Sequence, residues 1–113
     1  MSELVMLEPK TWKEVLDGEL TYLMLGKHDC PACEQWTAEL STALADGQSL
    51  DGVTYAKLFL DDVGWGRFKM ANPWVANVDV LPFNAIYVNG EAVKQWAGGG
   101  MERMQNRLSR YLS

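Results

Sequence analysis

Short apolar runs alternate with amphipathic stretches along the 113-residue chain. Runs rich in strand-forming residues predict β-strands, whereas apolar residues three or four positions apart predict helices. Strands are predicted at 4–7, 20–25, 53–60, 84–88 and 91–96, and helices at 11–17, 31–45, 64–71 and from 101 to the C-terminus. This order predicts an α/β fold, a central mixed sheet flanked by helices.

Capping and turn residues support several of these boundaries. Thr11 and Glu14 stand in capping-box spacing at the start of the first helix, and Pro73 must end or follow the third. Asn89-Gly90 between two strand-like runs predicts a two-residue hairpin. Met101, Met104, Leu108 and Tyr111 share one face of the last helix, and a neighbouring stripe of arginines at 103, 107 and 110 is predicted to face solvent.

The two cysteines of the chain, Cys30 and Cys33, lie where the predicted strand 20–25 leads into the predicted helix 31–45. Backbone N–H groups and the dipole at a helix N-terminus stabilise a thiolate there. A second cysteine one helical turn later is close enough to form a disulfide. Pro31 suits the first helical position, where its missing N–H costs nothing. This pattern predicts a dithiol redox site.

Composition and charge limit the classes of partner. A chain of 113 residues that is 48% hydrophobic predicts one domain, 1–113, which needs no disulfide to fold. A formal net charge of −5 argues against nucleic acid or an anionic membrane as partner. Neither a secretory signal nor an apolar run long enough to span a membrane is present, so we expect a cytoplasmic monomer.

The element order and the motif Cys30-Pro31-Ala32-Cys33 resemble the thioredoxin superfamily over residues 4–112. The segment 56–61 looks like the third strand of thioredoxins, with Lys57 in the position of a family lysine. Leu81-Pro82 looks like the family's apolar-proline step, which implies that Pro82 is cis and lies against the disulfide. Gly98 and Gly99 fall where the family has a glycine that lines the substrate groove, although they could also form a plain strand-to-helix turn.

The chain also departs from thioredoxins. Asp29 stands where they have a tryptophan, and Met24 where they have a buried aspartate that pairs with the lysine. Lys57 is therefore either a buried lysine near Cys33 with a lowered pKa, or a strand-edge lysine that reaches water. About six extra residues around Trp65 and Trp74 either cap the core or form an aromatic docking patch.

Some features are similar to glutaredoxins instead. Lys27 matches the lysine with which glutaredoxins hold the glutathione carboxylate, and the pair Gly98-Gly99 also resembles them. Leu81 differs from the threonine or valine that usually precedes their proline. The thioredoxin-like interpretation is favoured.

The predicted chemistry starts at Cys30, as the cysteine at the open helix end. Its thiolate would attack a substrate disulfide, and Cys33 would then attack the mixed disulfide and release the product. The charge of Asp29 disfavours the thiolate, whereas a protonated His28 would favour it. A metal site would need both cysteines, His28 and Asp29 as ligands; since consecutive residues rarely give good coordination geometry, no metal is expected.

We therefore predict a thiol–disulfide oxidoreductase that acts on protein or small-molecule disulfides through the Cys30–Cys33 dithiol. The expected electron donor is a separate reductase or glutathione, and no bound cofactor is expected. Two alternatives remain: a glutaredoxin-like, glutathione-dependent reductase, or a non-enzymatic interaction protein or redox sensor that binds through the tryptophan-bearing insertion. The direction of electron flow is left open, because reduction potential depends on nearby charge.

Overall fold

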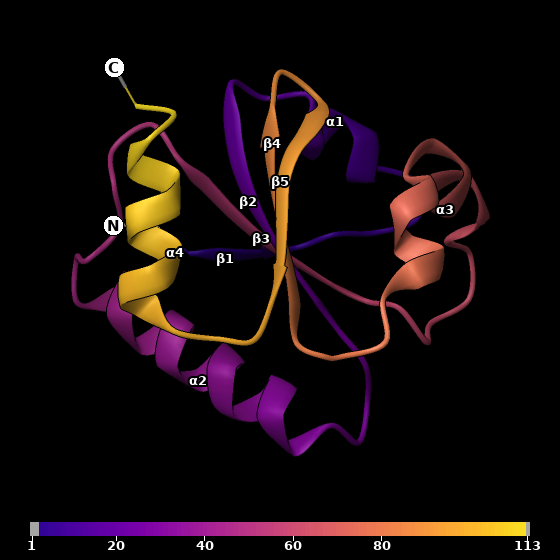
Figure 1. Ribbon diagram of the computed structural model, residues 1–113, viewed down its shortest axis with the longest axis horizontal. Coiled ribbons are helices and arrows are strands. Elements are labelled where there is room, and N and C mark those ends of the chain that lie inside the picture. The colour runs from indigo at the N-terminus through magenta and orange to yellow at the C-terminus, as the bar shows by residue number, and fades with distance from the viewer. Residues whose placement is uncertain (1–2, 113) are drawn as a thin grey trace.

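The computed structural model describes residues 3–112 (Figure 1). Within them, five strands form one mixed sheet in the order β1-β3-β2-β4-β5. Their bounds are β1 (Leu4–Met6), β2 (Leu20–Gly26), β3 (Thr54–Phe59), β4 (Phe83–Val88) and β5 (Glu91–Ala97). The strands β1, β2 and β3 are parallel to one another, and β4 runs antiparallel to both β2 and β5.

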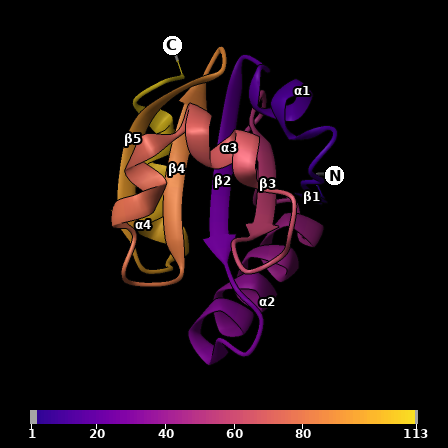
Figure 2. The same cartoon turned by 90° about the vertical axis from the view of Figure 1, so that its right-hand side faces the viewer.

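Helices cover both faces of this sheet (Figures 1 and 2). They are α1 (Trp12–Leu16), α2 (Pro31–Ala45), α3 (Gly66–Ala71), the 3-10 helix η1 (Pro73–Asn77) and α4 (Met101–Ser109). Helices α2 and α4 lie on one face, and α1 and α3 on the other. The α/β order and the mixed sheet flanked by helices are thus confirmed, and α2 has the bounds that were predicted.

The central strand β2 is buried along its whole length and divides the core in two. Successive side chains of a strand point to opposite faces. Tyr22 and Met24 accordingly pack with α2 and α4, whereas Leu23 and Leu25 pack with α1 and α3. Strand β2 ends at Gly26, and the chain then leads through a three-residue loop to Cys30.

The β4–β5 hairpin turns at Asn89-Gly90, as predicted. Both residues have positive φ, 51° for Asn89 and 88° for Gly90, and Val88 pairs directly with Glu91. These are the left-handed conformations that a two-residue hairpin turn requires.

Several local predictions need correction. The Thr11 side chain makes no capping hydrogen bond to α1. Pro73 follows α3, as predicted, but it also begins η1, a helix that was not predicted. Tyr111 lies beyond the end of α4 and is 38% exposed, so it is not part of the buried face. Arg107 is half-buried, with its guanidinium 4.7 Å from the centroid of the Trp96 ring, rather than solvated.

The aromatic insertion packs against the core. Trp65 is 3% exposed and meets Phe68 edge to face, with ring centroids 5.8 Å apart. Trp74 is half-buried, and its ring centroid lies 5.9 Å from that of Phe83. Of the two interpretations, core capping is therefore correct for Trp65, and an exposed docking patch that includes Trp65 is wrong.

Across residues 3–112, every helix is too short or too polar to cross a membrane.

Candidate dithiol site

The site begins at the junction between β2 and α2. Cys30 is the N-cap residue of α2, with an extended backbone (φ −118°, ψ 100°), and Pro31 fills the first helical position as expected. The Cys30 Sγ accepts a hydrogen bond of 3.2 Å from the backbone N–H of Cys33. That N–H has no partner within the helix, so the sulfur meets the free donor and the positive end of the helix dipole.

Cys30 and Cys33 form a disulfide, with their Cα atoms 5.2 Å apart. The two cysteines differ in exposure, because Cys30 is 8% exposed and Cys33 1%. A Cβ atom at Gly26 would lie 3.4 Å from the Cβ and 3.5 Å from the Sγ of Cys33, which shows how closely Cys33 packs against the end of β2. An incoming group can therefore reach Cys30 more easily than Cys33.

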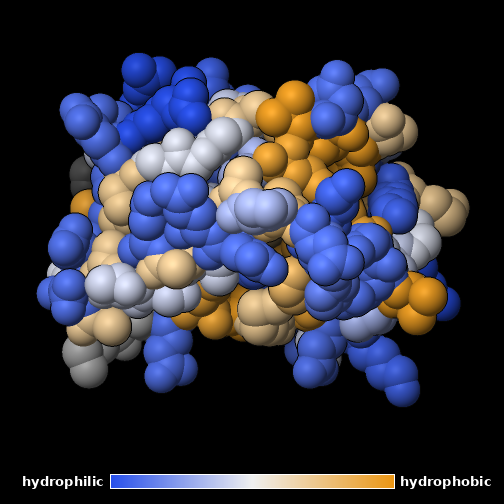
Figure 3. Space-filling view, turned by 90° about the horizontal axis from the view of Figure 1, so that it is seen from below, coloured by the Kyte–Doolittle hydropathy of each residue, from blue (hydrophilic) through white to orange (hydrophobic). Residues whose placement is uncertain are grey.

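A groove of ≈ 370 Å³ lies beside the N-terminal end of α2. It is lined by Ala32, Gln35, Trp36 and Glu39 of α2 on one side and by Leu81, Pro82 and Gly98–Gly100 on the other. The Leu81–Pro82 peptide bond is cis, as predicted. Figure 3 shows the face at the bottom of Figure 1, where this end of α2 lies, and both hydrophobic and hydrophilic side chains reach it.

Gly98 and Gly99, two of the three glycines that line the groove, are required for different reasons. Gly98 has φ 91°, which side-chain-bearing residues rarely adopt, and its N–H donates to the Pro82 carbonyl at 2.8 Å. A Cβ atom at Gly99 would lie 2.8 Å from the Trp36 ring. Arg103 then donates to the carbonyls of Ala97 (2.9 Å) and Gly99 (3.2 Å), which holds this loop beside α2.

Beneath the groove lies a buried polar network that the sequence analysis missed. The Trp36 Nε1–H donates to the Tyr22 hydroxyl at 3.0 Å, and that hydroxyl donates to the Asn84 side-chain oxygen. The Asn84 amide nitrogen donates to the carbonyls of Trp96 (3.0 Å) and Gly98 (2.6 Å). The available signal was an asparagine inside the otherwise apolar run 83–88, since a buried polar side chain needs partners.

Lys57 is a buried lysine, only 5% exposed, and the strand-edge interpretation is wrong because β3 lies between β1 and β2. Its ammonium donates to Thr37 Oγ1 at 2.8 Å and lies 4.3 Å from the centroid of the Phe59 ring. Burial lowers the pKa of Lys57, and the charge of Glu34 opposes that shift. The lysine is thus held in a desolvated position on the α2 side of the sheet.

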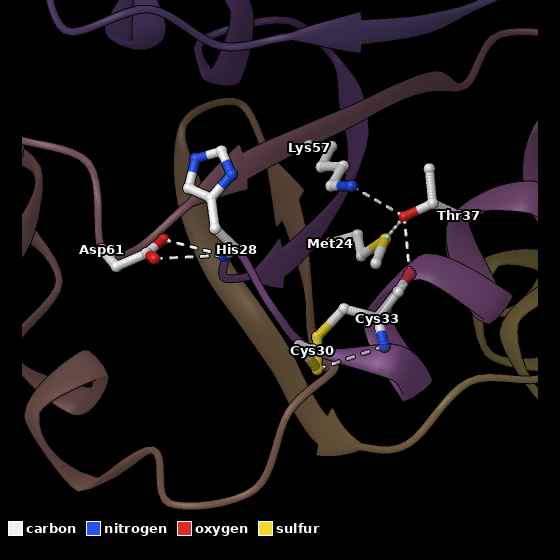
Figure 4. Close-up of a disulfide and its surroundings, with 7 residues drawn as sticks. All are labelled: Met24, His28, Cys30, Cys33, Thr37, Lys57 and Asp61. Carbon is white, nitrogen blue, oxygen red and sulfur yellow. Dashed lines mark hydrogen bonds between the residues drawn. A yellow bond between two sulfur atoms is a disulfide. The ribbon is translucent and has the colours of Figure 1, made fainter.

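Thr37 connects this lysine to the dithiol (Figure 4). Its hydroxyl accepts from Lys57 and donates to the Cys33 carbonyl at 2.7 Å. Met24 lies next to Lys57 in the β2–β3 register, and its sulfur is 3.5 Å from Thr37 Oγ1. A hydroxyl on α2 therefore contacts the lysine where a carboxylate on β2 would be expected from the thioredoxin resemblance. Sequence alone did not single out Thr37.

Lys27, His28 and Asp29 form the exposed loop before Cys30. The His28 backbone N–H donates to both carboxylate oxygens of Asp61 at 3.1 Å, and its ring hydrogen-bonds to Asp62 at 2.9 Å. The ring stacks on Phe59, with centroids 4.0 Å apart, and Figure 4 shows it pointing away from the disulfide. Asp29 adopts φ 57°.

The geometry also corrects the candidate metal ligands. His28 gathers with Asp61 and Asp62, whose ligand atoms all lie within 4.8 Å of one another, rather than with the cysteines and Asp29. All three residues are exposed, and hydrogen bonds between the loop before Cys30 and the segment after β3 already join them. The cysteines, His28 and Asp29 do not form the cluster that a shared metal would need.

No family model and no curated protein matches this sequence. Solved structures of thioredoxins are similar to it over nearly the whole chain. The short form of thioredoxin f from spinach chloroplast has a TM-score of 0.79 at 14% identity, covering 99% of this chain and 96% of that one. The thioredoxin of Malassezia sympodialis has a TM-score of 0.77 at 13% identity, covering 100% of this chain and 94% of that one. Thioredoxin f2 of Chlamydomonas reinhardtii has a TM-score of 0.74 at 18% identity, covering 96% of each chain.

These identities of 13–18% are low, and the likeness is therefore one of architecture. The strand order, the cis Leu81–Pro82 bond and the disulfide at the start of α2 agree with it. The chain has the thioredoxin fold, as its resemblance to the thioredoxin superfamily implied.

Proposed function

We propose that this protein is a thiol–disulfide oxidoreductase that exchanges electrons between the Cys30–Cys33 pair and disulfides in proteins or small molecules. One observation carries the proposal. The more accessible sulfur, that of Cys30, sits at the N-terminus of α2 and faces a backbone N–H that would stabilise its thiolate. The thioredoxin fold and the groove beside this sulfur support the same chemistry.

In the first step, the reduced protein presents Cys30 as a thiolate, and this attacks one sulfur of the substrate disulfide. The substrate S–S bond breaks as the bond between Cys30 and the substrate sulfur forms. The other substrate sulfur leaves as a thiolate and takes a proton from solvent. The Cys33 N–H and the helix dipole lower the cost of the charge on Cys30.

In the second step, Cys33 loses its proton and attacks the Cys30 sulfur. The Cys30–Cys33 disulfide forms, and the remaining substrate sulfur leaves as a thiolate. Two electrons have then passed from the dithiol to the substrate, and a separate reductase or glutathione would return them. Lys57 would favour the Cys33 thiolate, because its ammonium reaches the Cys33 backbone through Thr37.

Substrate would lie along the groove in an extended conformation, with the backbone of Leu81 available for strand-like pairing. The extended substrate segment would also contact other residues that line the groove, namely Ala32, Pro82, Gly98 and Gly99.

The test is reduction of insulin disulfides with two electron supplies, thioredoxin reductase with NADPH or glutathione with its reductase. Wild type is compared with Cys30→Ser and with Glu91→Lys, a control at the distant hairpin. We expect turnover that Cys30→Ser abolishes and Glu91→Lys retains. Turnover with glutathione alone would assign the glutathione-dependent reaction, with Lys27 as the candidate carboxylate ligand. No turnover with either supply would contradict the proposal and leave a redox sensor.

A further inference from the structure

We propose that the groove beside the dithiol selects cationic polypeptides, because Glu39 pairs with a lysine or arginine close to the reacting substrate cysteine. The inference rests on the proposed exchange reaction and goes further by naming its substrate class. Its basis is the distribution of charge around the groove.

Glu39 is the one ionisable side chain among the residues that line the groove. It lies on the wall made by α2, on the same helical face as Ala32 and Gln35, which are seven and four residues earlier. The Gln35 amide lies 3.5 Å from the Glu39 carboxylate, and both side chains are exposed, so the carboxylate is open to a substrate. A carboxylate has acceptor capacity for further donors.

The surroundings of the cysteines add charge of the same sign. Asp29 directly precedes Cys30, and Glu34 directly follows Cys33; both are exposed. The nearest cations are differently placed. Lys57 is buried behind the cysteines, and Arg103 of α4, which is not among the residues that line the groove, donates to the carbonyls of Ala97 and Gly99. Lys27 is exposed in the loop before Cys30, whereas both charged side chains of α2, Glu34 and Glu39, are acidic.

An extended substrate explains how Glu39 would be reached. Alternate side chains of a strand point the same way, so a peptide that runs past Leu81 directs every second side chain toward α2. A lysine or arginine there would lay its apolar stem over Ala32 and Trp36 and place its charged end at Glu39. A glutamate in the same position would meet a like charge. The net charge of −5 would add long-range attraction for cationic chains.

The experiment measures the single-turnover rate at which reduced protein cleaves three disulfide-linked peptides. The peptides are identical except that lysine, glutamine or glutamate stands two positions from the cysteine, on the side of the extended chain that faces α2. At low salt we expect the lysine peptide to react about three- to tenfold faster than the glutamate peptide, with the glutamine peptide between them. At roughly 0.5 M salt the difference should shrink, because charges at an exposed groove are screened.

Three substitutions locate the effect. Glu39→Lys and Glu91→Lys change net charge equally, but Glu91 lies at the hairpin turn, outside the groove. We expect Glu39→Lys to abolish or invert the preference, Glu39→Gln to weaken it, and Glu91→Lys to retain it. Equal rates for all three peptides, or the same loss in Glu91→Lys as in Glu39→Lys, would overturn the inference.

A neutral small disulfide, hydroxyethyl disulfide, separates this inference from the function on which it rests. If the protein exchanges with that compound at a normal rate but shows no preference among the peptides, the proposed charge selection is wrong and the proposed function stands. Failure to exchange with it or with any peptide contradicts the proposed function itself.

Discussion

The two faces of the central sheet each bury an apolar core, but they differ in the polar groups that they bury. On the face covered by α1, α3 and η1, the core consists mainly of residues such as Leu23, Leu58 and Phe68. Its polar side chains make hydrogen bonds: Tyr87 donates to Asn72 at 2.8 Å, Asn72 to the Phe68 carbonyl at 2.9 Å and Thr21 to the Val15 carbonyl at 3.3 Å. On the face covered by α2 and α4, the core contains the disulfide, the Tyr22–Asn84–Trp36 network and the buried ammonium of Lys57.

This difference indicates that one face contributes mainly to the stability of the fold, whereas the other also supports the exchange reaction. Apolar packing is tolerant of its exact partners, provided that volume and pattern are kept. Buried polar groups need specific partners, and each one fixes the position of its neighbours. On the α2 face those neighbours are the groove loop, through Asn84, and the Cys33 backbone, through Thr37. We infer that changes on the first face affect folding and that changes on the second also affect exchange.

The largest effect on stability is expected from Phe68→Ala on the apolar face. Phe68 is fully buried and contacts the rings of Trp12 and Trp65. Removing its ring should lower the free energy of unfolding by about 3–5 kcal/mol. Urea denaturation measures this loss. The exchange rate of the folded fraction should stay at the wild-type value, and a slower rate in fully folded protein would break the division between the faces.

Asn84→Ala should combine both kinds of effect. It leaves the Tyr22 hydroxyl without its acceptor and the carbonyls of Trp96 and Gly98 without the Asn84 donor, at a cost of about 1–3 kcal/mol in unfolding free energy. Because Gly98 borders the groove, we expect a raised KM for protein disulfides as well. Wild-type KM in this variant would show that the network supports the fold alone.

Gly99→Ala tests the close approach of the groove loop to α2. The new methyl group would lie 2.8 Å from the ring of Trp36, which is buried and cannot move freely, so the loop must shift. We expect a several-fold rise in KM for a protein disulfide and little change for a small one. Gly66→Ala is the matched control, since its Cβ would meet nothing within 4 Å. Equal effects of the two substitutions would contradict the groove assignment.

Lys57→Met should have a smaller effect, visible in the reduction potential. Removing the ammonium withdraws support for the Cys33 thiolate, so the dithiol should become more reducing by about 20–30 mV. Thr37→Val should shift the potential in the same direction by less, because the lysine remains but loses its contact with the Cys33 backbone. Unchanged potentials in both variants would show that Lys57 acts only in packing.

The same lysine predicts a pH dependence of stability. Burial lowers the pKa of Lys57 in the folded protein, so the unfolded chain binds more protons between that lowered pKa and about 10.4. Wild type should therefore gain stability relative to Lys57→Met as pH rises through this window. Chemical denaturation at several pH values provides the measurement, and a difference that is flat or falls with pH would contradict the burial of the charge.

Patterns local in sequence predicted the fold well. The periodicity of 31–45, the proline after Cys30 and the Asn89-Gly90 turn each determine their own structure through backbone preferences, so α2 and the hairpin were found where expected. Where the helix propensity of a segment is weak, the predicted set of helices was incomplete. The η1 helix was missed because five residues with one proline carry little helical signal.

The partners of buried polar groups could not be predicted, because they come from distant parts of the chain. Lys57 and Thr37 are 20 residues apart, and Tyr22 and Asn84 are 62 apart. Sequence spacing indicated that Lys57 lacked an acidic companion at Met24, but not that a helix residue would take its place. Nor did it distinguish a buried Trp65 from an exposed one, which depends on the packing of α3.

The proposed exchange mechanism depends most directly on the sulfur of Cys30 as the attacking atom. Reduced Cys30→Ser and Cys33→Ser variants would each be mixed with an aromatic disulfide such as 5,5′-dithiobis(2-nitrobenzoate), and the rate and lifetime of the mixed disulfide followed by absorbance and mass spectrometry. The account predicts that Cys33→Ser reacts rapidly and holds the adduct, while Cys30→Ser reacts much more slowly through its buried sulfur. Equal rates, or a faster reaction in Cys30→Ser, would contradict it.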